Sequence, residues 1–360
     1  LGVVRYEVVA FSDTDRAFNC RKDIDDYLLL HQCSELIEEK QWQDSLDVLE
    51  KIETDNLWLR YKQQKIRYQL AYHFERLQQY ELASNLYSRC DSFDSRVREI
   101  RILMATENYS PAWNRWQALY ADNDDVGIRQ TLNRLATRLA RKVGEKVPSK
   151  YQKVDEMRLC LVKSSIQQPI EVSAKHFLES AENPVFFVEN SLFTALLGLW
   201  CWDALFLPIQ GAFFHPFQAG PSDLTQPDFM SKRQSKFNVL WSLFKNDCYA
   251  QHIKNCYKQK YGIQNPLVSW TTISEDTLNL ALECIAPEQL RAIFNYMLTN
   301  LKERRSGIPD LIQFDTKRKE FELIEIKAPG DRLQQNQSVW FEFCRRQNIK
   351  CNLCYIEWID

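Results

Sequence analysis

The alternation of apolar and polar positions toward the end of the chain predicts a β-hairpin followed by a helix and a strand. Residues 311–314 form one apolar run, residues 315–319 are polar, and residues 321–327 form a second run. A helical pattern at 334–346 and a strand pattern at 350–359 follow. The second run of the hairpin carries charges among residues that are apolar on both faces, which sets it apart from an ordinary surface strand.

The first half of the chain has a different pattern, because residues 23–147 favour helices almost throughout. Residues 66–90 resemble a tetratricopeptide-like helical pair, and residues 42–52 and 110–120 echo its second helix. The spacing between these segments is irregular, so they are interpreted as degenerate repeats. A solenoid of this kind usually forms a scaffold or a surface for partners, and plain helical packing is an equally good interpretation.

Turn-forming residues mark the boundaries of the segments in between. Val147-Pro148-Ser149-Lys150 predicts a boundary, and residues 151–184 have a mixed pattern. Residues 186–206 predict a strongly apolar helix, and the Pro- and Gly-containing residues 211–228 predict a loop. The order from this helix onward is therefore α-β-β-α-β, with further helical stretches predicted at 229–260 and 287–304.

These boundaries predict three parts in the chain. Residues 1–22 are a connection, or the remnant of a missing N-terminal region, since the sequence has no initiator Met and residues 1–11 alternate poorly. Residues 23–147 form the helical domain. Residues 148–360 form the second domain, with its core at 186–206 and 305–360 and a helical insertion between them.

Composition narrows the class of protein. At 360 residues and 45% hydrophobic content the chain is long enough for two packed domains. Its 11 cysteines have no framework spacing, and the pair Cys351 and Cys354 lies on opposite faces of a predicted strand, which argues against a zinc knuckle or a redox pair. The sequence has no Gly-rich phosphate loop, no signal peptide and no apolar run long enough for a membrane span.

Two acids and a lysine are predicted to meet at one end of the hairpin. Pro309-Asp310 precedes the first strand, and Glu325 and Lys327 share one face at the end of the second. Such a cluster can hold a divalent cation through carboxylate oxygens and set an ammonium beside the water that is activated. The alternative is that Asp310 caps a turn and Glu325 pairs with Lys327 at the surface. Charges in a run that is apolar on both faces are costly unless they are paired or metal-bound, which favours the site.

The residues around these charges resemble those of a nuclease family. The segments 307–311, 325–333 and 337–340 are similar to the VRR-NUC branch of the PD-(D/E)xK nucleases, and residues 188–203 resemble the helix before that core in Fanconi-associated nucleases. The resemblance runs from about residue 20 to 360 and is strongest from Glu189 onward. It implies an α+β chain in which a helical, degenerate tetratricopeptide-like half precedes a restriction-endonuclease-like α/β core.

The resemblance also implies roles for single residues. Asp310, Glu325 and Glu189 are the expected catalytic carboxylates and metal ligands, and the backbone carbonyl of Ile326 adds an oxygen. Lys327 is expected to orient or deprotonate the attacking water. Oxygen ligands suit Mg²⁺ or Mn²⁺ rather than zinc. Glu189 is expected on the preceding helix, where its alternative role is that of a helix-start acid favoured by the dipole.

Candidate DNA contacts come from local clusters, because the net charge of −2 does not indicate a nucleic-acid binder. One cluster adjoins the Pro-Asp motif, one has helical spacing, and one lies at residues 232–236. Each cluster alone is more often a solvated surface than a binding site, but the cluster beside the Pro-Asp motif is favoured because it adjoins the predicted metal site. After the core, one arginine and one glutamine are expected to support the site or touch phosphates. The candidate residues are Lys302, Arg304 and Arg305; Arg134, Arg138 and Arg141; Lys232, Arg233 and Lys236; and Arg332 and Gln337.

The leading hypothesis is a metal-dependent, structure-selective DNA nuclease. The resemblance implies 5′-flap endonuclease and 5′-to-3′ exonuclease activity in interstrand crosslink repair, on branched or flapped DNA, with repair proteins bound through the helical half. The protein is expected in the cytoplasm of a bacterium or the nucleus of a eukaryote. A Holliday-junction resolvase or restriction-like endonuclease is one alternative, which the long helical half disfavours. A helical-repeat DNA-binding adaptor without catalysis is another, which the intact charged residues disfavour.

Overall fold

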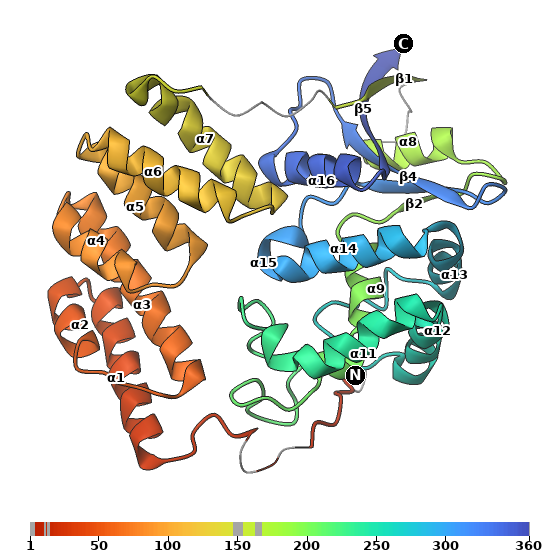
Figure 1. Cartoon of the computed structure of the whole chain (residues 1–360). Coiled ribbons are helices and arrows are strands. Elements are labelled where there is room, and N and C mark those ends of the chain that lie inside the picture. Colours follow the sequence, from red (N-terminus) through yellow and green to blue (C-terminus); the bar gives the residue numbers. More distant parts are fainter. Residues whose placement is uncertain (1–3, 11, 13–14, 147–153, 163–167, 360) are drawn as a thin grey trace. The chain divides into compact units, whose positions relative to one another are not determined.

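The computed structural model describes residues 4–10, 12, 15–146, 154–162 and 168–359, and it divides the chain into two compact units (Figure 1). The smaller unit spans Ser12–Lys150. The larger unit is discontinuous, since it combines Leu1–Phe11 with Tyr151–Asp360. The smaller unit is therefore inserted into the chain of the larger one. The predicted boundary at 147–150 lies outside the described residues.

The smaller unit is helical, as predicted. Successive helices pack against one another around two apolar clusters, one formed by the first four helices and the other by the last three. Local capping fixes several helix starts: Asn56 Oδ1 accepts from the backbone N–H groups of Trp58 and Leu59, and Asp125 caps the last helix through the amide of Ile128. The helices are α1 Arg21–Glu38, α2 Trp42–Leu49, α3 Leu57–Arg76, α4 Tyr80–Ser88, α5 Phe93–Ala105, α6 Tyr109–Ala121 and α7 Val126–Val143.

The larger unit is built on a mixed sheet of five strands in the order β1-β5-β4-β3-β2. Strand β5 runs parallel to both β1 and β4, while β3 is antiparallel to β4 and to β2. This sheet with its flanking helices confirms the predicted α/β core. The strands are β1 Glu156–Val162, β2 Val185–Phe187, β3 Leu311–Asp315, β4 Glu320–Lys327 and β5 Lys350–Ile359.

Two helices cover opposite faces of this sheet. Helix α8 (Ile170–Leu178) packs its Ala174 on the apolar face that contains Ile324 and Ile326. Helix α16 (Gln335–Arg346) contacts β5, and its Gln337 bonds to Glu325 and Lys327. Because successive β4 side chains alternate between faces, α16 covers the face opposite to α8.

The residues of helix α9 are all buried. Helices α12 and α14 pack against it. A bidentate ion pair between Asp223 and Arg233, both almost fully buried, lies in the same region. No helix among the described residues is both long and apolar enough to cross a membrane. The helices are α9 Leu192–Trp200, α10 Trp202–Leu205, the 3₁₀ turn η2 Ser231–Arg233, α11 Gln234–Lys245, α12 Tyr249–Lys260, α13 Glu275–Cys284, α14 Pro287–Thr299 and α15 Leu301–Arg304.

The segment 186–206, predicted as one helix, is instead a strand, a loop and two helices. Phe186 pairs with Ile312 in the ladder between β2 and β3, and its ring lies against Phe314. Apolar residues make up both the edge strand and the buried helix, and only the short loop at residues 188–191 lies between them, so the predicted helix spans all three. Glu189 lies in the loop and not on the predicted helix.

Within the N-terminal part predicted as a connection or a remnant, residues 4–10 pack on the larger unit. Arg5 forms a parallel bridge with Ile263. The Glu7 carboxylate accepts from Trp202 Nε1 at 2.6 Å and from Lys260 Nζ at 2.7 Å. Trp202 and Lys260 thus bind this segment from positions 195 and 253 residues further along the chain.

Candidate active site

The open end of the β3–β4 hairpin brings together the three charged residues that the sequence singled out. Leu311 pairs with Ile324, so Asp310 lies beside Glu325 where β3 begins and β4 ends. Asp310 Oδ2 accepts a hydrogen bond from the backbone N–H of Ile326 at 2.9 Å. The register of the hairpin therefore sets the spacing between the two carboxylates.

Glu325 and Lys327 form a buried ion pair. Their residues are 1% and 6% exposed, and Lys327 Nζ lies 2.9 Å from Glu325 Oε1. The second carboxylate oxygen, Glu325 Oε2, is buried and has no hydrogen-bond partner among the residues that the structure describes. A buried charged oxygen without a partner is costly, so this atom is suited to a cation.

Gln337 of α16 bridges this pair. Its Nε2 donates to Glu325 Oε1 at 2.5 Å, and its Oε1 accepts from Lys327 Nζ at 3.0 Å. The same Oε1 accepts from the backbone N–H of Gln334, which closes a capping box at the start of α16. The first turn of the helix is therefore tied to the charged residues of β4.

Burial and like charge raise the pKa of both carboxyl groups. Burial raises the pKa of Asp310 to about 6, with Glu171 and Glu189 adding to the effect and the Ile326 N–H and Lys327 opposing it. Burial and the Asp310 carboxylate raise the pKa of Glu325 to about 7 against the opposing effect of Lys327. A bound cation would therefore offset the repulsion between these carboxylates and stabilise their charged forms.

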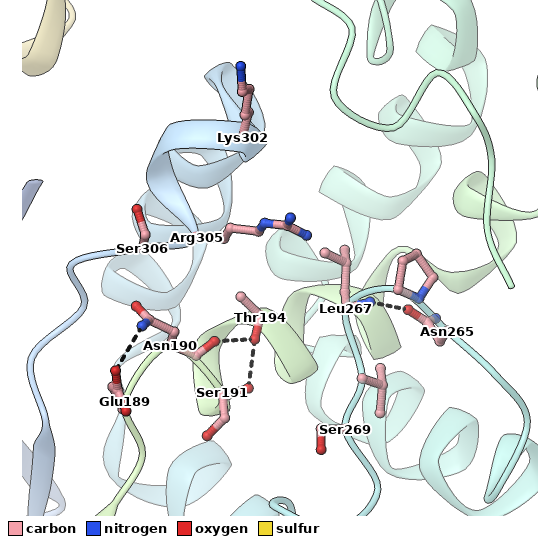
Figure 2. A pocket seen from close by; sticks show the side chains of 12 residues that line it. Glu189, Asn190, Ser191, Thr194, Asn265, Leu267, Ser269, Lys302, Arg305 and Ser306 are labelled. Carbon is pink, nitrogen blue, oxygen red and sulfur yellow. Dashed lines mark hydrogen bonds between the residues drawn. The ribbon is translucent and has the colours of Figure 1, made fainter.

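Glu189 approaches this region from the loop between β2 and α9. The backbone N–H groups of Val188 and Glu189 both donate to the Asp310 carbonyl, at 2.9 and 3.2 Å. The Glu189 side chain is exposed and lines a hollow of about 720 Å³ (Figure 2). Thr194 of α9, the loop from Asn265 to Ser269, and Lys302 and Arg305 form the other walls.

The residues present fit a divalent cation in part. Asp310 and Glu325 offer carboxylate oxygens close to one another, and one of these oxygens is buried without a partner. Within the described ranges, no three His, Cys, Asp or Glu side chains gather closely enough to form a metal-binding group. Glu189 therefore stands near the two buried carboxylates without joining them. The backbone carbonyl of Ile326, the fourth expected ligand, lies between Glu325 and Lys327 on β4.

The predicted DNA-binding residues have different surroundings. Lys302 and Arg305 are exposed beside the hollow, where Figure 2 shows Arg305 reaching over it and Lys302 pointing away. Arg304 is buried, its guanidinium lies over the Tyr296 ring, and its Nη1 donates to the Tyr296 hydroxyl at 2.7 Å. Arg304 is therefore a packing residue, and its prediction as a phosphate contact is corrected.

The remaining predicted DNA contacts lie on other elements. Arg332 is exposed in the loop after β4. Arg134, Arg138 and Arg141 are exposed on α7 of the smaller unit, at the spacing of one helix face. Arg233, by contrast, is buried in its ion pair with Asp223 and so cannot present its charge to DNA.

Two residues near the site were missed by the sequence analysis. Glu171, in the first turn of α8, is half-buried and contributes to the raised pKa of Asp310. Asn190 donates from Nδ2 to Glu189 Oε1 at 3.4 Å. Its left-handed backbone favours Asn or Gly, but a single Asn in a sequence gives no sign of its φ angle.

The mixed sheet, its two covering helices and the paired carboxylates with a lysine define the class of protein. This is the core architecture of the PD-(D/E)xK nuclease superfamily. A model of the VRR-NUC domain matches residues 245–358, which include β3, β4 and α16 and nearly all of β5.

Whole-chain comparisons then identify the family. The chain is 35% identical over 99% of its length to the Fanconi-associated nuclease 1 homolog of Pseudomonas aeruginosa and covers 65% of that protein. It is 24% identical to human Fanconi-associated nuclease 1 over 52% of its own length and 19% of the human protein. A crystal structure of paFAN1 bound to DNA with a 1-nucleotide 5′ flap and a gap is 34% identical, with a TM-score of 0.83, over the whole chain and 67% of that protein. The chain belongs to the Fanconi-associated nuclease family.

Proposed function

We propose that the chain is a metal-dependent, structure-selective DNA nuclease that acts in the repair of interstrand crosslinks. It hydrolyses phosphodiester bonds as a 5′-flap endonuclease and a 5′-to-3′ exonuclease. The observation that carries this proposal is the group of half-buried Asp310 and buried Glu325 and Lys327, in which Glu325 Oε2 has no hydrogen-bond partner within the described ranges. Family membership and the 5′-flap DNA in the paFAN1 structure support it.

Asp310, Glu325, the Ile326 carbonyl and Glu189 are the proposed ligands for Mg²⁺ or Mn²⁺. All four offer oxygen, which these hard cations prefer. A bound divalent cation supplies Lewis acidity at the phosphate and lowers the pKa of a water molecule. The protein contributes negative charge held out of water, in the form of Glu325 Oε2 and two carboxyl groups with raised pKa values.

Lys327 is the proposed catalytic ammonium. Glu325 and Gln337 hold its Nζ at 2.9 and 3.0 Å, so the charge is fixed before the substrate arrives. In this position it orients the attacking water and offsets the negative charge that grows on the phosphate. Gln337 keeps Glu325 and Lys327 in register with the start of α16.

Phosphate contacts by exposed cations are the proposed basis of DNA binding. Lys302 and Arg305 lie beside the hollow that Glu189 lines, and Arg332 follows β4. Such contacts bind DNA of any sequence, so the choice of substrate comes from the shape of the DNA. Repair proteins are proposed to bind the helical unit. The nuclease would act on DNA in the cytoplasm of a bacterium or the nucleus of a eukaryote.

Cleavage assays on the full chain test this function. A 5′-flap substrate, a four-way junction and a plain duplex, each in several sequence contexts, are incubated with Mg²⁺, Mn²⁺ or EDTA. We expect cleavage of the flap in either metal, none in EDTA, and little dependence on base sequence. Asp310→Asn and Lys327→Ala should lose at least ~100-fold in rate, on the order of an acid–base or electrostatic contribution, and still bind DNA.

The same assays distinguish the alternatives. Preferred cleavage of the four-way junction would favour a resolvase, and dependence on sequence without regard to the flap would favour a restriction-like enzyme. Binding of flapped DNA without cleavage in any metal would favour the non-catalytic adaptor. Wild-type rates for Asp310→Asn would contradict the proposed site whatever the substrate.

A further inference from the structure

Asn190 has an unusual backbone next to a proposed metal ligand. Its φ angle is +35°, in the left-handed region that non-glycine residues seldom adopt. It lies in the loop between β2 and α9, immediately after Glu189, and lines the same hollow. Strained backbone near a site is kept when the surrounding contacts hold it there.

The side chain of Asn190 supplies one of those contacts. Its Oδ1 accepts from the backbone N–H of Ile308 at 3.2 Å, across 118 positions of sequence. Ile308 lies two residues before Asp310. The same two segments are joined by the bonds from the Val188 and Glu189 amides to the Asp310 carbonyl. Asn190 therefore adds a side-chain bond to a backbone junction between two parts of the proposed site.

The orientation of the Asn190 amide follows from this bond. A backbone N–H can only donate, so the atom facing Ile308 is the oxygen. The amide nitrogen then faces Glu189, where Nδ2 donates to Oε1 at 3.4 Å. Among the described residues, Asn190 is the one whose side chain donates a hydrogen bond to the exposed Glu189 carboxylate. It is long, so it can hold the carboxylate in place and still release it.

This donor opposes a repulsion. Asp310 and Glu325 are coupled electrostatically to Glu189, since Glu189 raises the pKa of both. Like charges repel, so an exposed carboxylate beside two other acids is pushed away from them unless a donor restrains it. The Asn190 amide is neutral, so it restrains Glu189 without competing as a cation for the space between the acids.

We propose that Asn190 is a positioning residue that holds the Glu189 carboxylate near Asp310 and Glu325. The proposal rests on the function proposed above, in which Glu189 is a metal ligand. Each part of the asparagine has a separate role. The backbone takes the left-handed turn, Oδ1 ties the loop to the segment before Asp310, and Nδ2 restrains Glu189.

Three variants separate these roles. Asn190→Gly keeps the left-handed turn and removes both side-chain bonds. Asn190→Asp keeps an acceptor for Ile308 but replaces the donor with a fourth negative charge. Asn348→Gly is the matched control, because Asn348 is exposed, has a φ angle of +53° and lies between α16 and β5 of the same unit.

The measurements are Mn²⁺ binding to the DNA-free full chain by electron paramagnetic resonance, and single-turnover cleavage of a 5′ flap across a range of Mn²⁺ concentrations. For Asn190→Gly we expect about tenfold weaker Mn²⁺ binding and a rate about tenfold lower at limiting Mn²⁺, as for residues that hold metal ligands. DNA affinity in EDTA and thermal stability should match Asn348→Gly. Asn190→Asp should not restore the rate.

The double variant with Glu189→Gln completes the test. If Asn190 acts through Glu189, then Asn190→Gly should change Mn²⁺ binding little once Glu189 has been replaced. Three results would each overturn the proposal. They are wild-type Mn²⁺ affinity in Asn190→Gly, a wild-type cleavage rate in Asn190→Asp, and an effect of Asn190→Gly on Mn²⁺ binding that is as large in the Glu189→Gln background as in the wild type. Absence of cleavage by the wild type on every substrate would instead reject the proposed function, and the Mn²⁺ titrations would still decide the role of Asn190.

Discussion

At the scale of single residues, the site holds ionisable side chains in places where burial makes their charged forms costly. Glu325 is almost completely buried, and one of its oxygens lacks a partner even though Lys327 and Gln337 serve the other. Asp310 is half-buried and has one backbone donor for Oδ2. Such an arrangement lowers the stability of the ion-free protein, so metal binding and folding should be linked.

Asp310→Asn should therefore stabilise the metal-free protein at neutral pH. The folded-state pKa of about 6 lies above the ordinary value of 3.8, because burial opposes ionisation. Between these values the unfolded chain has lost its proton and the folded chain has kept it, so wild-type stability falls as pH rises through this window and stays lower above it. The neutral variant avoids this loss, and we expect a gain on the order of 1–3 kcal/mol at pH 8 and almost none near pH 4.

Urea unfolding of the full chain in EDTA at several pH values measures this effect. Asp331→Asn is the control, since Asp331 is exposed in the loop after β4 and its substitution should leave the pH profile unchanged. Added Mn²⁺ should stabilise the wild type more than Asp310→Asn. A variant that is no more stable than wild type at pH 8 would show that the Asp310 carboxylate is not strained in the folded state.

At the scale of elements, the sequence predicted what depends on local alternation and missed what depends on tertiary pairing. The hairpin, α16 and β5 follow from period-two and helical patterns, and the meeting of Asp310 with Glu325 follows from the hairpin register. The strand β2 was missed because it has only three residues and a short loop separates it from an apolar helix, so the pattern predicts one helix across both. The burial of Arg304 was missed because a cluster of basic residues does not show which of them packs on an aromatic ring.

The turn before β3 packs closely on the start of α16, the helix that carries Gln337. Gly307 has a φ angle of +78°, and a Cβ there would lie 2.7 Å from the backbone carbon of Asn336 on α16. Gly307→Ala must therefore move either the Asp310 segment or the helix that carries Gln337. We expect a loss of stability of about 2–4 kcal/mol, from left-handed strain together with overpacking, and a large loss of flap cleavage.

Gly330→Ala separates the two contributions to this loss. Gly330 follows β4 and has a φ angle of +91°, and apart from its chain neighbours no atom of the described residues lies within 4 Å of an added Cβ. It should lose only the strain of about 1–2 kcal/mol. Equal urea midpoints for the two alanine variants would mean that close packing of the turn on α16 contributes nothing.

At the scale of the whole molecule, the helical unit adds a basic stripe to a chain with almost no net charge. Replacing Arg134, Arg138 and Arg141 by alanine should weaken binding of all DNA sequences alike. The slope of log affinity against log salt should flatten by about 0.9 for each lost phosphate contact. The control replaces Arg60, Arg96 and Arg101, which are exposed on α3 and α5, and removes the same charge. Identical salt slopes for the two triple variants would show that net charge, and not the α7 stripe, is responsible.

The insertion of one unit into the other also determines the order in which the protein can assemble during synthesis. The helical unit depends on contacts between neighbouring helices, so it can fold as soon as α7 has left the ribosome. The sheet has to wait, because β5 is the last of its strands to be made and lies between β1 and β4. Until β5 emerges, β1 has no neighbour in the sheet and α16 has no strand β5 to pack on. A nascent chain would thus carry a finished helical unit for some time before its buried carboxylates are enclosed.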